Sequence, residues 1–284
     1  MPGAISVLVE PGEPRAGRPV RAVARKHRGA AIGYAWVDGD GGLQLRLDGR
    51  GLSPHDRVAT GIALGGALHE HHPFDGWFVR SSGTVELGIA SGLGLEQTRA
   101  LWQMRVPLPV GPAEGTVDTV ALRAFVVGQD EEAWVRVNNR AFAEHRDQGR
   151  QTVELLRAQE RAPWFDPDGF LLHEREGHLA GFCWTKVHLD ADPVVGEIYV
   201  IGVDPDAHGH GLGRSLVLAG LAHLHAKGVT EGMLYVDDDN GPAVRLYRDL
   251  GFVTVSTDIH FQRASALRTE VSQPVETPTA DPTR

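Results

Sequence analysis

The sequence predicts a mixed α/β fold, in which a mixed sheet carries helices on both faces, and it predicts that this fold occurs twice. In the second half, strand and helix patterns follow one another in the order βααβββαβαβ, which is typical of such a sheet. In addition, Leu93-Gly94-Leu95 matches Leu250-Gly251-Phe252, and Gly51-Leu52 precedes a helical pattern as Gly211-Leu212 does. Because these matches keep their order at a shift of about 157 to 160 residues, we expect two copies of one fold.

The elements of the second half follow from its apolar patterns and its glycines. Helices are indicated where apolar residues recur at helical spacing, at 131–145, 151–159, 215–228 and 240–251. Glycine ends the last two of these helices. Strands are indicated where apolar residues alternate or form short buried runs, at 120–127, 169–174, 177–189, 196–205, 232–236 and 252–263.

The first half shows a shorter and weaker series. Two strands, at 31–37 and 43–49, are expected to pair across a turn. They are followed by a helix at 55–72, a strand at 76–80, a short helix at 81–94 and a closing strand at 95–108. Few residues precede the first of these strands. We therefore expect this copy to be truncated and degenerate, without its opening strand and helices.

Composition changes suggest where the domains end. Residues 107–117 are rich in Pro and Gly, as a linker is, and residues 265–284 are rich in Pro, Thr and Glu with few large apolar groups, so they cannot offset the cost of ordering. We predict a degenerate first domain at 1–106, the linker, a catalytic domain at 118–264 and a disordered tail.

The charge balance excludes several classes of partner. The 284 residues include 28 Lys and Arg against 37 Asp and Glu, a net charge of −9, whereas nucleic acids and anionic membranes attract basic surfaces. The single cysteine, Cys183, excludes an internal disulfide and a cysteine-rich zinc site, and no apolar run has the length of a membrane span. We expect a soluble, cytoplasmic, monomeric enzyme that uses no metal and acts on a small amine.

A glycine-rich loop between a strand and a helix carries the clearest chemical signal. Gly209, Gly211 and Gly213 leave backbone N–H groups uncovered, and the following helix adds the partial positive charge of its N-terminus. This pattern favours a phosphate or pyrophosphate, although an ordinary turn rich in glycine would look the same. The loop lacks the Lys-Ser/Thr of a Walker A motif and the spacing of a Rossmann loop.

Two motifs together resemble the GCN5-related N-acetyltransferases. They comprise Val203, Pro205, His208, Gly209, Gly211 and Gly213, and then Asn240, Ala243, Tyr247, Gly251 and Phe252. His208 stands where the family usually has Gln or Arg. The resemblance implies that acetyl-CoA binds with its pyrophosphate on the loop, along Ile201, Gly202, Val203, His208, Gly209, His210, Gly211, Leu212, Gly213, Arg214, Asn240, Gly241, Pro242, Ala243, Val244 and Arg245.

Acetyl transfer to an amine needs a base for the amine and a donor for the departing thiolate. Glu197, on the strand before the loop, is the candidate base, and Tyr199 and Ile201 are expected on its face because side chains alternate along a strand. The resemblance makes Tyr247 the candidate acid. A backbone N–H within 201–203 would hold the developing oxyanion. The alternatives are a solvent-facing Glu and a core Tyr.

The second half resembles most closely the active domain of family members with two tandem domains. Those enzymes acetylate the cysteinyl amine of cysteinyl-glucosaminyl-inositol, which implies acceptor contacts by Glu144, Lys186, Glu197 and Tyr235. The first half has Ser53 and Pro54 where the loop needs glycine, so we expect it to lack catalysis and tight CoA binding. The chain could instead acetylate another amine, such as a peptide N-terminus or an antibiotic, or bind acetyl-CoA without catalysis.

Overall fold

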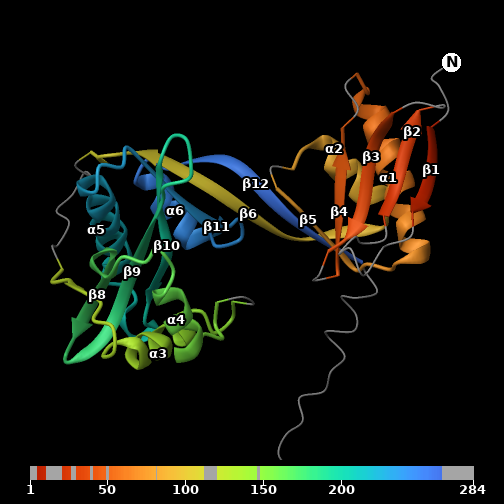
Figure 1. The fold of residues 1–284 in the computed structure, drawn as a ribbon. Helices are drawn as coiled ribbons and strands as arrows, with labels where there is room; N and C mark the ends of the chain where they lie inside the picture. The colour runs from red at the N-terminus through yellow and green to blue at the C-terminus, as the bar shows by residue number, and fades with distance from the viewer. Residues whose placement is uncertain are drawn as a thin grey trace, which may run out of the picture. The chain divides into compact units, whose positions relative to one another are not determined.

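The computed structural model describes residues 5–10, 21–26, 30–38, 41–48, 51–80, 82–111, 120–145 and 148–263 (Figure 1). The contacts among these residues form two compact units. The first contains the described residues up to Leu101 and from Ser256 onward, and the second is Trp102–Val255. The division falls inside strand β6 (Leu95–Pro107) and strand β12 (Val253–Arg263), so each strand contributes one end to each unit. Residues 112–119, which include part of the expected linker, and the expected tail lie outside the described residues.

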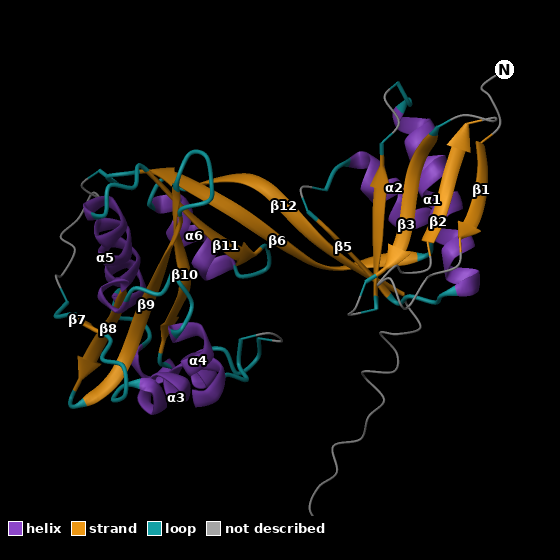
Figure 2. Ribbon diagram, in the orientation of Figure 1, coloured by secondary structure: helices purple, strands orange, loops and turns teal. Residues whose placement is uncertain are grey.

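The first unit has a sheet in the order β1-β2-β3-β4-β5-β12-β6 (Figure 2). Its elements are β1 (Ile5–Glu10), β2 (Arg21–Lys26), β3 (Ala31–Val37), β4 (Gly42–Leu47), α1 (Pro54–His71), β5 (Gly76–Val79) and α2 (Thr84–Gly92). The predicted elements from residue 31 to residue 108 are confirmed. Both helices pack on the sheet around Leu43, Leu64, Leu68 and Ile89, which are fully buried.

The opening strand of the first copy is present, so the prediction that it is missing is wrong. β1 pairs antiparallel with β2 from Ile5↔Lys26 to Glu10↔Arg21, and β2 pairs in turn with β3. Residues 11–20, between β1 and β2, lie outside the described residues, so the expected absence of the opening helices stays a prediction. The argument from length failed for the opening strand, because β1 needs only six residues.

The second unit has a sheet in the order β12-β6-β11-β10-β9-β8-β7. Its other elements confirm the predicted order: β7 (Arg123–Ala124), α3 (Glu131–Ala141), α4 (Val153–Glu160), η2 (Pro167–Gly169), β8 (Phe170–Arg175), β9 (His178–His188), β10 (Val195–Val203), η3 (Pro205–Ala207), α5 (Leu212–Ala226), β11 (Glu231–Asp237) and α6 (Gly241–Asp249). β10 and β11 run parallel, whereas β7, β8, β9 and β10 pair antiparallel.

Two apolar clusters cover the two faces of this sheet. One surrounds α5 and α6 and includes Cys183, Ile198, Leu216 and Tyr247. The other lies against α3 and α4 and includes Trp134, Phe170, Phe182 and Trp184. Gly220 lets α5 approach closely, because a Cβ there would lie 2.6 Å from the Cys183 Sγ atom. Side chains of β9 and β10 can thus be assigned to a face by the cluster that they join.

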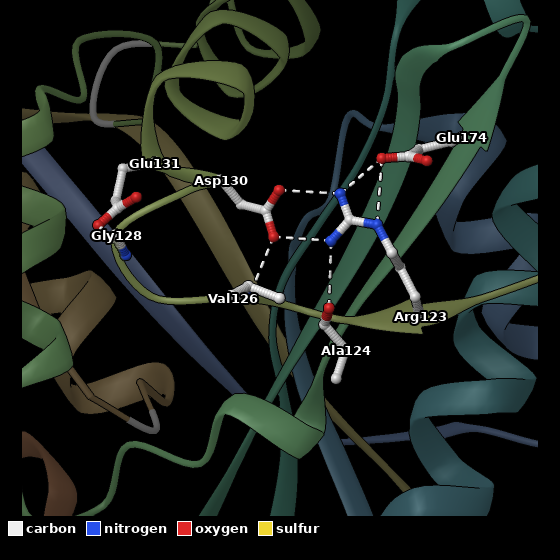
Figure 3. A network of polar contacts seen from close by, with 7 residues as sticks. All are labelled: Arg123, Ala124, Val126, Gly128, Asp130, Glu131 and Glu174. Atoms are coloured by element: carbon white, nitrogen blue, oxygen red, sulfur yellow. Dashed lines mark hydrogen bonds and ion pairs between the residues drawn. The ribbon is translucent and has the colours of Figure 1, made fainter.

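An ion-pair network fixes the start of α3 to the edge of the sheet (Figure 3). The Arg123 guanidinium donates to both oxygens of Asp130, at 2.7 and 2.8 Å, and to Glu174 on β8. Asp130 also accepts from the Val126 backbone N–H at 2.8 Å. The hydrogen bond from Arg123 holds the pKa of Asp130 below its usual range. Charge pairing therefore joins β7, β8 and the N-terminus of α3.

The structure confirms the sequence repeat at two levels. Gly94 and Gly251 both adopt a positive φ, +67° and +88°, in the turn before the closing strand of each copy. The parallel strand pairs also match, since β4 and β5 pair at Gly42↔Gly76 and Leu43↔Trp77, as β10 and β11 do at Gly196↔Gly232 and Glu197↔Met233. Leu43 thus takes the position of Glu197 in the first copy, and Ala90, three residues before Leu93, takes that of Tyr247.

Candidate active site

The candidate site lies where β10 and β11 part. The two strands pair only at Gly196↔Gly232 and Glu197↔Met233, although both continue for several residues beyond. On its other edge β10 stays paired with β9 as far as Val203↔Gly181. Beyond Glu197, the edge of β10 that faces β11 is therefore available to a ligand that lies along it, as a peptide does when it adds to a sheet.

A bulge in β10 changes which side chains share a face. The register with β9 shifts between Ile198 and Val200, so Tyr199 is the extra residue. Tyr199 and Val200 both pack on the α3 and α4 cluster, whereas Ile201 packs on the α5 and α6 cluster. The expectation that Ile201 shares a face with Glu197 is therefore wrong, because the bulge breaks the period of two.

Glu197 is buried, with 7% of its surface exposed. It pairs across the strands with Lys186, which lies two residues beyond Trp184 on β9, so both side chains are on the α3 and α4 face. Burial raises the pKa of Glu197, while the hydrogen bond from His188 and the charge of Lys186 oppose that rise. A carboxyl group in such surroundings is suited to act as a base near neutral pH.

His188 is a contact that the sequence analysis missed. Its Nε2–H donates to Glu197 Oε2 at 2.7 Å, and its side chain is 25% exposed. Lys186 and His188 are two residues apart on β9, so a search for polar residues at period two beside the partner of Glu197 could have found it.

Aromatic rings surround the Lys186 ammonium group. Its Nζ atom lies 4.6 Å from the ring centroid of Trp164 and 5.3 Å from that of Tyr199. The Tyr199 hydroxyl accepts from Gln159 Nε2 at 3.4 Å. Trp164 packs against the α3 and α4 cluster and forms a wall beside the predicted acceptor residue Lys186.

The other two predicted acceptor residues are more exposed. Tyr235 lies on β11 two residues past Met233, the partner of Glu197, and so shares its face; its hydroxyl accepts from Gln103 Nε2 at 2.6 Å. Glu144 is exposed in the turn after α3. The structure thus brings Lys186, Glu197 and Tyr235 onto one face of three adjacent strands. Among the described residues, no contact adds Glu144 to them.

The predicted glycine loop adopts a backbone that suits an anion. Gly209 and Gly211 have φ values of +85° and +71°, and a Cβ at either would meet no atom within 4 Å. Gly211 is the N-cap of α5 and supplies no side-chain cap to the N–H groups of the first turn. The His208 ring donates to the carbonyl of Val203 at the end of β10, at 3.0 Å, and the His210 ring donates to the His208 carbonyl, at 2.9 Å, so both hold the shape of the loop.

The second predicted cofactor segment adjoins the first. Asn240 caps α6 through its side chain, which accepts from the Ala243 N–H at 3.3 Å. A Cβ at Gly213 in the first turn of α5 would lie 3.8 Å from Leu246, so this turn lies against the middle of α6. Between them and the sheet, Ile201 and Val203 pack on the same apolar cluster as Val244.

Tyr247 approaches from the face opposite Glu197. It lies on α6 within the α5 and α6 cluster and is 6% exposed. Burial raises the pKa of Tyr247 well above its usual value, and the nearby Cys183 thiol adds to the rise. The hydroxyl is therefore protonated at neutral pH and can act as a donor.

Each unit has a cavity among its described residues. One of about 690 Å³ in the second unit shares only His210 with the predicted site and is otherwise lined by residues of β7, α3, β8, β9 and the segment 204–207. The other, of about 450 Å³, lies in the first unit between β4, β5, α1 and α2 and contains Arg46, Arg57 and Arg80. The first copy thus keeps an opening between its parallel strands, with Leu43 and Trp77 as the last paired residues.

Ser53 distinguishes the helix that follows this first opening. Its side chain caps α1 by accepting from the Asp56 N–H at 3.1 Å, and its hydroxyl donates to the Asp56 carboxylate at 2.8 Å. The N-terminus of α1 therefore carries a capping hydroxyl and a negative charge, unlike that of α5.

The sequence matches known acetyltransferases. Residues 133–252 match the Acetyltransferase (GNAT) family. A mycothiol acetyltransferase of Thermobispora bispora is 52% identical over 62% of this chain and 61% of its own length. That of Thermomonospora curvata is 45% identical over 87% of this chain and 84% of its own length.

Solved structures with the same fold support the two-copy architecture. A GCN5-related N-acetyltransferase from Sphaerobacter thermophilus has a TM-score of 0.65 at 23% identity and covers 86% of this chain and 80% of that one. A tandem GNAT protein from the clavulanic acid biosynthesis pathway has a TM-score of 0.55 at 17% identity, covering 92% and 83%. At these identities the likeness concerns the fold.

Proposed function

The chain belongs to the mycothiol acetyltransferases of the GNAT family, and on that premise we propose that it transfers the acetyl group of acetyl-CoA to the cysteinyl amine of cysteinyl-glucosaminyl-inositol. The observation that carries the proposal is the position of Glu197. Its buried carboxylate lies at the last residue of β10 that pairs with β11. The same strand leads to the glycine loop and to the N-terminus of α5, which has no side-chain cap.

The glycine loop fits the pyrophosphate of CoA. A backbone with two left-handed glycines exposes N–H groups, and the N-terminus of α5 adds partial positive charge with no side chain in the way. The N-terminus of α6, from Asn240 to Arg245, would provide a second set of polar groups and a cation. Ile201 and Val203 would lie along the acyl arm and offer backbone N–H groups to the thioester oxygen.

Glu197 and Tyr247 would then serve the two proton transfers from opposite faces of the sheet. Glu197 takes the proton of the substrate ammonium on the α3 and α4 face, which makes the amine nucleophilic. Tyr247 donates a hydrogen bond or a proton to the CoA sulfur from the α5 and α6 face. This separation keeps the base away from the acid, so neither neutralises the other.

The acceptor would lie on the face that carries Lys186, Glu197 and Tyr235. Hydroxyl groups of a sugar can bond to the Lys186 ammonium and the Tyr235 phenol, while the amine meets the carboxylate. Glu144 would join these contacts from the turn after α3. The Trp164 ring offers an apolar surface for the sugar and fixes Lys186 at the same time.

The first unit would have no catalytic role. Leu43 and Ala90 occupy the positions of Glu197 and Tyr247, so both proton-transferring groups are missing from this copy. The capping hydroxyl of Ser53 and the charge of Asp56 make the start of α1 a poorer phosphate site than the start of α5. This arrangement supports a structural function for the first copy.

The proposal is tested by turnover with defined acceptors. The purified chain is incubated with acetyl-CoA and cysteinyl-glucosaminyl-inositol, and mass spectrometry follows the gain of one acetyl group while chromatography follows free CoA. We expect both products in equal amounts, and none with glucosaminyl-inositol, which lacks the cysteinyl amine. Turnover only with peptides or other amines would contradict the acceptor assignment.

A further inference from the structure

His188 contacts the carboxylate that the proposed function uses as a base. We propose that His188 positions Glu197 for proton abstraction, because its ring N–H holds Oε2 and leaves Oε1 for the substrate amine; this inference rests on the proposed function. The 2.7 Å bond ends on Oε2, and the described residues offer Oε1 no hydrogen bond. A carboxylate that is held at one oxygen stays in one rotamer, and its other oxygen then points to the substrate amine.

Strand geometry supports this arrangement. His188 pairs with Val195 and Lys186 pairs with Glu197, so His188 is the diagonal neighbour of Glu197 across the antiparallel strands. Because the β9 and β10 pair is continuous here, the backbone fixes both side chains. The bond to His188 therefore defines the position of the carboxylate more firmly than a contact between two loops would.

His188 is also the group that can hold Glu197 most directly. The titratable groups that face Glu197 are Lys186 and His188 on β9, Tyr199 on β10 and Tyr235 on β11. Lys186 Nζ lies over the rings of Trp164 and Tyr199, and no ion pair within 4 Å joins it to Glu197 among the described residues. No hydrogen bond joins Tyr199 to Glu197 in the described part of the chain, and the Tyr199 hydroxyl accepts from Gln159.

The bond also helps to keep the base ionised. Burial favours the neutral acid at Glu197, and the N–H of His188 stabilises the carboxylate against it. Loss of that donor should raise the pKa of Glu197, so the acidic limb of the pH profile should move to higher pH. Above that limb the carboxylate is ionised in either case, and the difference in rate should shrink.

The test compares two side chains of similar length that differ in the N–H donor. We expect His188→Met to shift the acidic limb of kcat/KM upward by about one pH unit, with a roughly ten-fold loss of rate below the limb and an unchanged KM for acetyl-CoA. His188→Gln keeps an N–H donor and should retain most of the activity at an almost unshifted limb. His173→Ala, on β8, whose ring bonds to the Ala121 carbonyl, serves as the control and should leave the profile unchanged.

The outcomes separate this inference from the proposed function. If Glu197→Gln is inactive while His188→Met and His188→Gln share the wild-type limb, the positioning role is wrong. A lower thermal stability of His188→Met with an unmoved limb would likewise reduce His188 to a structural residue. If Glu197→Gln keeps full activity, the base assignment itself fails. His188→Ala replaces His188→Met in the comparison should the latter not fold.

Discussion

Glu197→Gln is expected to lower kcat by about 10²- to 10⁴-fold, the range that a positioned general base contributes. The amide has the shape of the carboxylate and can still accept a hydrogen bond, but it cannot take the proton of the ammonium group. Because the glycine loop is separate from Glu197, the dissociation constant for CoA should stay unchanged. The wild-type enzyme should gain activity with rising pH through the pKa of Glu197, which burial places above its ordinary value.

The pH profile provides the internal check on this prediction. The ionised form of Glu197 is the active one, so activity rises as the carboxyl loses its proton, and the acidic limb should disappear in Glu197→Gln. Glu176→Gln, in the exposed turn between β8 and β9, is the matched control and should behave as the wild type. A Glu197→Gln variant with wild-type kcat at pH 7 would remove Glu197 from the mechanism.

Tyr247→Phe is expected to lower kcat by about 10²-fold, near the lower end of the same range, because a CoA thiolate is a better leaving group than an alkoxide. The substitution removes one hydroxyl and keeps the ring that packs on Phe252, with centroids 5.7 Å apart, so the fold should be retained. The effect should fall on kcat rather than on the affinity for CoA, since the hydroxyl acts as the sulfur departs.

A leaving-group comparison tests the acid role directly. Acetyl thioesters with a more acidic thiol need less protonation, so the deficit of Tyr247→Phe should shrink with them. Tyr34→Phe, on β3 of the first unit, is the control and should leave kcat unchanged. An equal deficit for all thioesters would indicate a packing role in place of acid catalysis.

Much of the second unit was predictable because its patterns are long and regular. Apolar residues at helical spacing defined α3 and α5, and Gly228 and Gly251, which have φ values of +86° and +88°, defined where α5 and α6 end. The strand pattern before the loop placed Glu197 on β10, and the second motif placed Tyr247 on α6. Local sequence was sufficient here because each signal lies within a few residues of the feature that it predicts.

Features that depend on contacts between distant segments escaped prediction. β1 and β2 are six-residue strands whose pairing is visible only when both are placed side by side. The sharing of β6 and β12 between the units is likewise a tertiary property. The bulge at Tyr199 altered the faces of β10, and His188, one of 14 histidines, becomes significant only through the register of β9 with β10.

The central claim, that a main-chain loop around Gly211 binds the pyrophosphate of a thioester carrier, is tested most directly by calorimetry. We expect the wild-type chain to bind CoA but not pantetheine, which lacks the phosphates, because the loop contributes N–H groups to an anion. Gly211→Val, which forces a β-branched residue into a φ of +71°, should weaken CoA binding by roughly ten- to a hundred-fold, as 1–3 kcal/mol of strain implies. Gly41→Val introduces similar strain at φ +81° in a turn of the first unit and should leave the affinity unchanged. Equal binding of pantetheine and CoA, or wild-type affinity in Gly211→Val, would contradict the claim.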